Sequence, residues 1–427
     1  MDSFKERAGK IKTVAILGAG PAASTLATLL AREGIRIAIF HRPRTAPLLV
    51  GESLVPAIVL MLRKLGVEKE VAAYSKYKPG ACFNIGAQMD FPFAFKDFCG
   101  SFPPYAYNVP RIQFEATLLE TAHKAGAKII EADAKVERIA VTDKVKLSDE
   151  TLAAAGDFFT DGRSGSDQPD LIVDATGRVR LLPKLLDIPG REGGRKDTAL
   201  FAHVDTAKLY EDGYVHSTRL DHGWSWRIPL PGRVSVGIVI GSEFLPQFGA
   251  TKEERYDNLL KQDSVLRTVA GGAKRLTPVM EYTNYQLVSQ RITGDGWALV
   301  GDTAGFIDPV FSSGLFIGMN SAFALAKAIS CGTPPAFQDY EKEVTHHLKI
   351  WHEIVGYFYD GRLFTSFSVG EKLRRNFLMK LAFPHINRHM GKIFLGAAST
   401  SPYSIRLLRM LVKHGLRNED PKTMAVR

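Results

Sequence analysis

Residues 13–32, with the sequence TVAILGAGPAASTLATLLAR, decide the fold. The short apolar run at 13–17 predicts a buried strand, and residues 21–33 place apolar side chains at helical spacing. A glycine turn joins the two, and a second apolar strand follows at 35–40. The pattern predicts a βαβ unit, and therefore a parallel sheet with a nucleotide site at the carboxyl ends of its strands.

The turn has the pattern GxGxxA, which comprises Gly18, Gly20, Pro21, Ala22 and Ala23. The first glycine suits a tight turn, and the second lets the backbone approach a pyrophosphate, whose charge the helix N-terminus stabilises. Because a strand precedes the turn and a helix follows it, the pattern predicts a dinucleotide site. The alternative is a turn that only packs the helix on the strand.

The end of the second strand leaves the identity of the cofactor open. An acidic residue that binds the adenosine ribose is expected there, but the position holds His41, followed by Arg42. Arg42 is a candidate cofactor-binding residue, and a basic residue here can bind a 2′-phosphate. The N-terminal region alone therefore does not distinguish FAD from NADP.

The composition is that of a globular protein with several subdomains. Its 427 residues are 45% hydrophobic, with 38 Gly and 22 Pro, which excludes disordered, collagen-like and coiled-coil chains. Three cysteines (Cys82, Cys99 and Cys331) lack disulfide or metal-ligand spacing, so no metal site is predicted. The apolar stretch 13–31 is broken by glycine and proline, and no cleavable leader precedes it. We therefore expect a cytoplasmic protein without a transmembrane segment.

The positive charge is concentrated near the C-terminus. Residues 371–427 hold 12 Lys+Arg and 3 acidic residues, which accounts for nine of the ten net charges. The remainder is nearly neutral, which argues against a nucleic-acid partner. A basic terminal region suits an acidic partner protein, a membrane surface or simple exposure to solvent.

The order of predicted elements indicates an α/β fold with an insertion. Strands alternate between residues 191 and 293, which predicts an antiparallel-sheet substrate domain. This domain interrupts a Rossmann-like domain formed by residues 1–190 and 294–335, and residues 336–427 are expected to form a helical C-terminal region.

A second motif follows the strand expected at 297–300. It begins with Gly301 and Asp302 and continues to a glycine-containing helix start at Gly314. This arrangement brings the Asp302 carboxylate to a bound polyol chain and free N–H groups to an anion. An aspartate that only caps a helix is the alternative.

Five stretches of the chain resemble flavin-dependent halogenases: residues 18–23, GESLVP at 51–56, Lys78 in YKPGA, WSWRIP at 224–229, and 301–314. WSWRIP fits the WxWxIP motif of that family without a mismatch. The likeness spans roughly residues 12–367 and is closest to the branch acting on phenols and on carrier-tethered pyrroles. It implies FAD, used as FADH2, and makes residues 1–190 and 294–335 an FAD-binding domain.

The resemblance also implies how halide is used. In that family reduced flavin and O2 convert chloride or bromide to hypohalous acid, which reaches a lysine beside the substrate. Lys78 matches that catalytic lysine. Its ammonium can donate a hydrogen bond to the oxidant, and its amine can form a haloamine. Ser313 and Gly314 match the turn that binds halide through backbone N–H groups.

Other matched residues are expected around the flavin. Glu52, a second candidate catalytic residue, and Ser53 match a segment near the isoalloxazine ring, and Arg111 matches an FAD-contacting arginine. An ion-paired or capping carboxylate and a surface arginine are the alternatives for Glu52 and Arg111. Trp224 and Trp226 share one face of a predicted strand. There they either separate flavin from substrate or pack in an ordinary core.

The resemblance implies a substrate class and partners as well. Phe311 stands where tryptophan halogenases carry a glutamate. This difference favours an electron-rich phenol or pyrrole, free or attached to an acyl or peptidyl carrier protein. Since no second dinucleotide motif is visible, a separate flavin reductase is the expected partner. The expected setting is antibiotic biosynthesis and other secondary metabolism. No histidine lies in a motif that marks it as a general base.

Two other functions stay open. An aromatic hydroxylase that uses NADPH directly would share GxGxxA and the Gly301–Asp302 motif, but it gives no role to Lys78 or WxWxIP. A non-catalytic protein that docks an acidic carrier would use the amphipathic helix expected around Ile405 and Leu408. A terminal helix packed on the rest of the protein is the simpler interpretation of that pattern.

Overall fold

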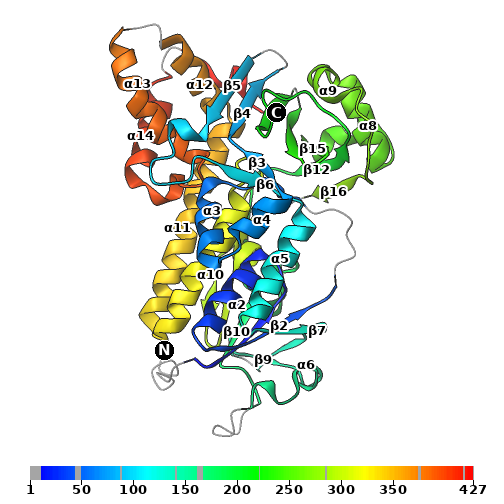
Figure 1. The fold of residues 1–427 in the computed structure, drawn as a ribbon, viewed down its shortest axis with the longest axis vertical. Helices are drawn as coiled ribbons and strands as arrows, with labels where there is room; N and C mark the ends of the chain where they lie inside the picture. Colours follow the sequence, from blue (N-terminus) through cyan, green and yellow to red (C-terminus); the bar gives the residue numbers. More distant parts are fainter. Residues whose placement is uncertain are drawn as a thin grey trace.

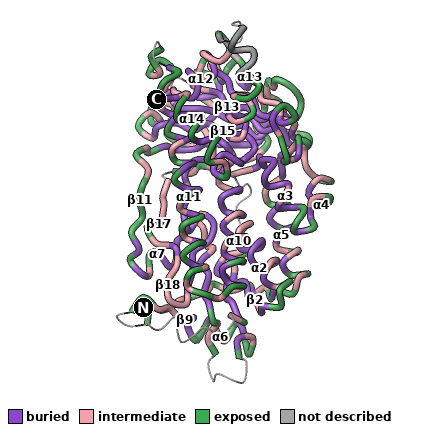
Figure 2. Tube along the Cα trace, turned by 90° about the vertical axis from the view of Figure 1, so that its left-hand side faces the viewer, coloured by how far each residue is buried: buried purple, intermediate pink, exposed green. Residues whose placement is uncertain are grey.

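The structure is a computed structural model in which two sheets lie at opposite ends of an elongated molecule (Figure 1). The longest helices run between the two ends, and buried residues continue from one half into the other (Figure 2). The residues that the structure describes are 11–43, 50–86, 89–139, 142–160, 167–220, 222–283, 286–373, 377–416 and 419–426.

The first sheet is the predicted nucleotide-binding sheet. Its strands are parallel except for β18, which is antiparallel to β19. β1 is completely buried, as expected for a strand covered by helices on both faces. The strand order is β18 (Thr293–Gly294), β19 (Trp297–Leu299), β10 (Leu171–Asp174), β1 (Thr13–Leu17), β2 (Arg36–His41), β7 (Lys128–Glu131).

Long helices cover this sheet and connect the two halves. They are α2 (Pro21–Arg32), α5 (Arg111–Lys124), α10 (Ser313–Cys331) and α11 (Pro334–Tyr359). α2 packs against both α5 and α10, and α10 packs against α11. Within the described residues, α10 is the one helix whose length and composition would allow it to cross a membrane. More than half of its apolar window is buried inside the fold, as in core helices that pass the same test.

The second sheet differs from the predicted one in which strands it contains and in the relative direction of two of them. Its order is β16 (Met280–Thr283), β12 (Asp197–Val204), β15 (Arg233–Gly241), β14 (Gly223–Leu230), β13 (Val215–Leu220), β4 (Gly80–Ile85), β5 (Met89–Ala94). β4 pairs in parallel with β13, so the sheet is mixed rather than purely antiparallel. The segments 80–85 and 89–94, which the sequence places in the FAD-binding domain, lie in this sheet, where β4 pairs with β13.

The insertion also contains two helices that its alternating pattern did not predict. They are α8 (Lys252–Gln262) and α9 (Ser264–Ala270). A capping box between Thr251 and Glu254 starts α8, and the Asp263 carboxylate caps α9. Both helices pack on one face of the second sheet and bury a separate apolar cluster there.

The C-terminal region is helical, as predicted. It comprises α12 (Arg362–Leu373), α13 (Phe377–Met390) and α14 (Pro402–His414). On α14, Ile405 and Leu408 are buried whereas Arg406 is exposed. The amphipathic pattern thus describes a helix packed on the protein, and Arg409 on its exposed side pairs with Glu353 of α11.

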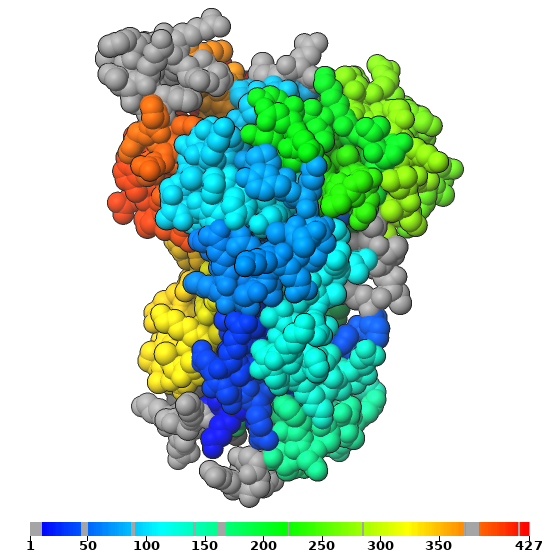
Figure 3. All heavy atoms as spheres, viewed as in Figure 1, coloured from blue at the N-terminus to red at the C-terminus, as the bar shows by residue number. Residues whose placement is uncertain are grey.

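Short elements complete the fold. On the face drawn in Figure 3, residues from about 50 to 110 cover the middle of the molecule between its two halves. The strands in these connections are β3 (Lys76–Lys78), β6 (Ala106–Asn108), β8 (Val136–Arg138), β9 (Val145–Leu147), β11 (Gly190–Glu192), β17 (Leu287–Ser289), β20 (Gly305–Phe306). The helices are α3 (Pro56–Leu65), α4 (Glu68–Tyr74), α6 (Asp149–Ala155), α7 (Leu181–Leu185).

Candidate active site

The glycine turn after β1 forms one wall of the site. Gly18 has a φ of +102°, and a Cβ there would lie 2.6 Å from the carbonyl oxygen of Ala175. The turn therefore needs glycine both for its conformation and for the close approach of β10. α2 begins directly afterwards with Gly20 as its N-cap and Pro21 in its first turn, so the first N–H groups of the helix have no partner within it.

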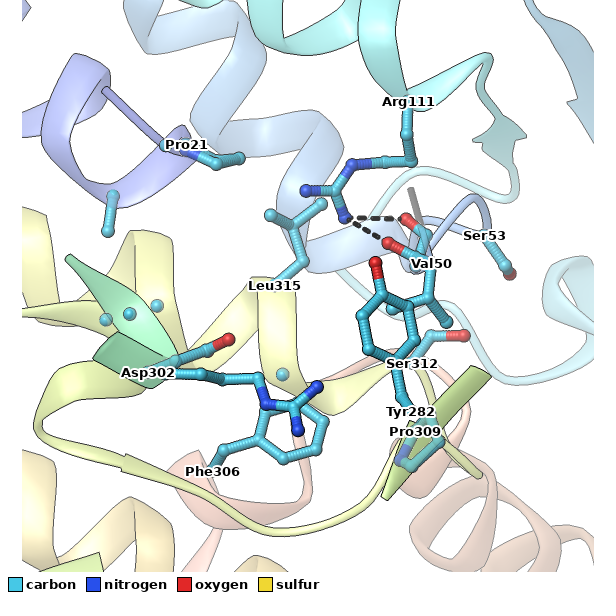
Figure 4. A pocket seen from close by; sticks show the side chains of 18 of the residues that line it. Pro21, Val50, Ser53, Arg111, Tyr282, Asp302, Phe306, Pro309, Ser312 and Leu315 are labelled. Carbon is cyan, nitrogen blue, oxygen red and sulfur yellow. Dashed lines mark hydrogen bonds between the residues drawn. The ribbon is translucent and has the colours of Figure 1, made fainter. Parts of the chain in front are cut away.

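A cavity of about 360 Å³ opens at this turn and extends toward the second sheet. Pro21, Arg111, Asp302 and Leu315 project into it from different elements (Figure 4). The cavity is lined by the glycine turn (Gly20–Ala23), the segment after β10 (175–179), residues of β13 and β14, residues between 300 and 318, and also Val50, Gly51, Ser53, Arg111, Glu115 and Tyr282. It thus joins the nucleotide-binding sheet to the predicted substrate domain.

Arg111, at the start of α5, holds the loop that precedes GESLVP. Its Nη1 donates to the carbonyl oxygens of Val50 (3.1 Å) and Gly51 (2.9 Å), as Figure 4 shows by dashed lines. Its Nη2 donates to Glu115 at 2.6 Å. Gly51 has a φ of +89°, and a Cβ there would meet the Arg111 guanidinium at 2.5 Å. Arg111 lines the cavity, and its backbone contacts give it a role in shaping the loop as well.

Asp302 lies opposite the glycine turn, in the short 3-10 helix Gly301–Thr303. Burial raises the pKa of its carboxyl to about 6, although the nearby guanidinium groups of Arg111 and Arg178 act against that rise. Arg178 also lines the cavity, with its guanidinium 5.1 Å from the centre of the Tyr282 ring. The Asp302 carboxylate, the two arginines and the free helix N-terminus suit a ligand that carries both hydroxyl groups and phosphates.

Lys78 is buried behind the cavity wall. It is 3% exposed, and its Nζ donates to Ser53 Oγ at 2.7 Å and to the carbonyl oxygen of Leu54 at 2.8 Å. Ser53 itself lines the cavity. The Phe95 ring lies 5.4 Å from Nζ. Burial lowers the pKa of Lys78 to about 7, because the ammonium loses its water and no carboxylate among the described residues compensates that loss.

Glu52 belongs to a buried chain that the sequence did not reveal. His203 of β12 contacts Glu52 Oε1 through Nε2 at 2.6 Å. Arg233 Nε donates to His203 Nδ1 at 3.0 Å, so Nδ1 is the acceptor and Nε2–H is the donor to the carboxylate. Glu52 and His203 are 151 residues apart. No local spacing signals this contact, which anchors GESLVP to the second sheet.

Two tryptophans form the cavity wall on the side of the second sheet. Trp224 and Trp226 of β14 both line the cavity, and their ring centres are 5.8 Å apart. Gly237 on the neighbouring strand leaves room for Trp226, since a Cβ there would approach the ring to 2.0 Å. Trp226 Nε1 donates to Ser235 at 3.3 Å.

The turn before α10, residues 308–314, forms the remaining wall and is called the anion turn below. Ser312 adopts a left-handed backbone with φ +56°, which is uncommon for a residue with a side chain and costs about 1 kcal/mol. Ser312 and Gly314 line the cavity. Ser313 is buried, and its hydroxyl has no hydrogen-bond partner in the described part of the chain. A free helix start beside an unpaired hydroxyl is suited to a small anion.

Asp308 begins the anion turn and is also buried. Its Oδ1 accepts from the Val310 N–H at 3.0 Å, and its Oδ2 accepts from the Tyr359 hydroxyl at 2.8 Å. Burial raises the pKa of Asp308 to about 7 in spite of these donors. Sequence spacing did not single out Asp308 or Tyr359, because they are 51 residues apart on different elements.

The structure does not bring every predicted residue to the cavity. Arg42, expected at the cofactor, is exposed and forms an ion pair with Asp133 on the surface. His41 ends β2 opposite Glu131 of β7. Phe311 is buried against the rings of Phe83 and Phe358 rather than in the cavity wall.

Comparisons with known proteins agree with this arrangement. A family model described as tryptophan halogenase matches residues 13–99 and 96–367. The chain is 26% identical over 407 residues to a 1H-pyrrole-2-carbonyl (peptidyl-carrier protein) chlorinase of Pseudomonas fluorescens, covering 86% of this chain and 88% of that protein. It is 30% identical over 362 residues to a tryptophan 2-halogenase of Chondromyces crocatus, covering 81% and 67%.

A solved structure has the same fold. A flavoprotein/dehydrogenase from Cytophaga hutchinsonii superposes with a TM-score of 0.77 at 23% identity, over 94% of this chain and 98% of that one. At this identity the likeness concerns the fold, and it confirms the predicted combination of a Rossmann-like domain, a second sheet and a helical C-terminal region.

Proposed function

Because this chain belongs to the tryptophan halogenase family and is a flavin-dependent halogenase, we propose that it halogenates an electron-rich aromatic ring through Lys78. The acceptor would be a phenol or a pyrrole, free or attached to a carrier protein. The observation that carries the proposal is the buried Lys78 ammonium, which hydrogen-bonds to Ser53 in the cavity wall. A buried lysine with no carboxylate partner among the described residues is costly, and such groups are typical of functional sites.

The family implies FAD, and the residues of the cavity fit it. The turn Gly20–Ala23 and the start of α2 would hold the pyrophosphate, and Asp302 would hold hydroxyl groups of the ribityl chain. Arg111 and Arg178 supply positive charge on the same walls. When bound in its reduced form, the flavin supplies, with O2, the oxidising equivalent that turns halide into hypohalous acid. A separate reductase would deliver the reduced cofactor.

The anion turn would bind chloride or bromide. The N–H groups of Ser313 and Gly314 lie at the N-terminus of a 19-residue helix, where the backbone dipole favours a negative charge. The unpaired hydroxyl of Ser313 adds a further donor. Trp224 and Trp226 would keep the organic substrate away from the cofactor while a small oxidant passes.

Lys78 would present the oxidant to the substrate. Its two hydrogen bonds use two N–H bonds of Nζ, and the third position would face the oxidant. In the ammonium this position is a donor to hypohalous acid, and in the amine it is a lone pair that accepts the halogen. Transfer to the ring is an electrophilic substitution: the ring carbon gains the halogen and loses its proton, and the hydroxyl of the acid leaves as water. Glu52, fixed by His203, would hold the GESLVP segment that bears Ser53.

Two observations support the substrate class. By the resemblance, Phe311 takes the glutamate position of tryptophan halogenases, and it packs among other rings, which supports a substrate ring that needs no base at that position. The name of the Pseudomonas fluorescens chlorinase specifies a pyrrole attached to a carrier protein. This supports a tethered acceptor for this chain as well.

The test is mass spectrometry of a reconstituted reaction. It contains the protein, FAD, a flavin reductase, NADH, O2, bromide, and phenols, pyrroles and indoles in free and carrier-bound form. We expect a product with the bromine isotope doublet that disappears in Lys78→Ala. Lys76→Ala, on the same strand but paired with Asp212 at the surface, is the control and should retain the product. Product formation by Lys78→Ala at the wild-type rate, or a gain of one oxygen without bromine, would contradict the proposal.

A further inference from the structure

A chain of hydrogen bonds connects the tryptophan wall to the anion turn through α11. Trp224 Nε1 donates to the Tyr359 hydroxyl at 3.0 Å, and this hydroxyl donates to Asp308 Oδ2 at 2.8 Å. The direction of the chain is fixed, since an indole nitrogen can only donate. Tyr359 is the last residue of α11 and lies 135 residues from Trp224 and 51 from Asp308.

The anion turn borders one cavity, and two residues that donate to its Asp308 border a second one. Pro309 and Val310 line the cavity described above. A second cavity of about 350 Å³ is lined by Tyr359 and Gln286, the two side chains that donate to Asp308 Oδ2. The hydrogen bond from Gln286 to Asp308 is long, at 3.4 Å, so the bond from the Tyr359 hydroxyl is the shorter of the two.

The turn also contains a backbone conformation that must be held by its surroundings. Ser312 is left-handed, and the other contacts near it are a backbone bond from Ser312 N to Pro309 O and a long bond from Ser217 Oγ to Val310 O at 3.4 Å. Left-handed residues with side chains persist only where neighbouring contacts over-determine them. Asp308 supplies such a contact, since its Oδ1 accepts from Val310 N and its Oδ2 is fixed from outside the turn.

We infer that Tyr359 is a positioning residue for the halide site: its hydroxyl fixes Asp308 and, through it, the conformation that directs the N–H groups of Ser313 and Gly314 to an anion. The inference rests on the proposed function for the identity of the anion. The same hydroxyl accepts from Trp224, so one atom contacts both the tryptophan wall and the anion turn.

The tyrosine ring is held independently of its hydroxyl, which makes the inference testable. The Arg195 guanidinium lies 4.1 Å from the ring centre, and Arg195 is itself fixed by two hydrogen bonds to Asp197. The Tyr359 carbonyl oxygen accepts from the Val426 N–H at 2.9 Å. Tyr359→Phe should therefore retain the helix end and the ring and remove only the hydroxyl.

Tyr357→Phe is the matched control. Tyr357 lies on the same helix, and its hydroxyl donates to Glu353 at 2.7 Å, away from the anion turn. Both variants and the wild type are compared by three measurements on the full chain. These are amide hydrogen exchange of residues 305–316 with FAD bound, FAD affinity, and the KM for bromide in the reconstituted reaction.

We expect Tyr359→Phe to speed exchange in residues 305–316 and to raise the KM for bromide about fivefold, the factor that corresponds to one lost hydrogen bond. FAD affinity and the thermal midpoint should match those of Tyr357→Phe. Unchanged exchange, or faster exchange with an unchanged KM, would overturn the inference. If the wild type forms no halogenated product, the proposed function fails, and the exchange measurement alone still decides whether Tyr359 holds the turn.

Discussion

Replacing Lys78 by methionine distinguishes the role of the lysine in halogenation from its effect on the free energy of unfolding. Methionine has a similar length and no charge, so the change removes the ammonium without opening a large cavity. In the folded protein Nζ is buried, and its pKa is lowered to about 7 from 10.5 by desolvation. The lowering corresponds to about 5 kcal/mol at 1.36 kcal/mol per pH unit.

The sign of the effect follows from proton binding. Because the pKa is lower in the folded state than in the unfolded state, the unfolded chain binds the proton more tightly. The unfavourable contribution is therefore complete below about pH 7 and vanishes as the pH rises to 10.5. Near pH 7 the charge costs about 4 kcal/mol, and the loss of the hydrogen bonds to Ser53 and Leu54 costs the variant about 1 kcal/mol each.

We thus expect Lys78→Met to be more stable than the wild type by about 2 kcal/mol near pH 7, equal to it near about pH 9, and less stable above. The assay is urea denaturation followed by tryptophan fluorescence at several pH values, with the difference between variant and wild type as the readout. Halogenated product should be absent at every pH. A stability difference that does not change with pH would refute the lowered pKa, and a variant that still halogenates would refute the catalytic role.

Two further predictions concern the anion turn and the glycine turn. Burial raises the pKa of Asp308 to about 7, so its carboxyl is neutral below that pH and repels an anion above it. We expect the KM for bromide to rise several-fold between about pH 6 and about pH 8.5 in the wild type and to stay level in Asp308→Asn; equal pH profiles for the two proteins would show that Asp308 does not act on the halide. Gly18→Ala should weaken FAD binding at least about tenfold in a flavin fluorescence titration, because the new Cβ meets the Ala175 carbonyl in a left-handed backbone. Gly34→Ala, which is equally left-handed but has free space, should lose stability and keep its FAD affinity; a similar loss of affinity in both variants would contradict the role of the close approach.

The sequence predicted those parts of the site that depend on neighbouring residues. The strand–glycine–helix pattern placed the helix at 21–33, and α2 spans Pro21–Arg32. The two-residue spacing of Trp224 and Trp226 placed both rings on one side of a strand, where they line the cavity. These signals are local, because turn geometry and strand alternation are set within a few residues.

The remaining features depend on contacts between distant parts of the chain. Arg42 follows the second strand as a phosphate-binding residue would, yet it pairs with Asp133. The contacts of Glu52 with His203 and of Asp308 with Tyr359 join different elements, so the spacing of residues in the sequence does not predict them. One missed element did have a signal: Thr251 and Glu254 form a capping box, and their spacing is visible in the sequence before α8.

The parallel pairing of β4 with β13 has a consequence for how such an enzyme can be rebuilt. After β3, which carries Lys78, the chain enters the second sheet as β4 and β5 and returns through β6 to α5. Residues 191–293 thus do not form their sheet alone, because its edge is supplied by β4 and β5, which follow β3 and its Lys78 in the chain. A chimera that exchanges only 191–293 would pair a foreign β13 with the resident β4. Keeping the native pairing of this sheet therefore requires moving residues 76–108 together with the insertion.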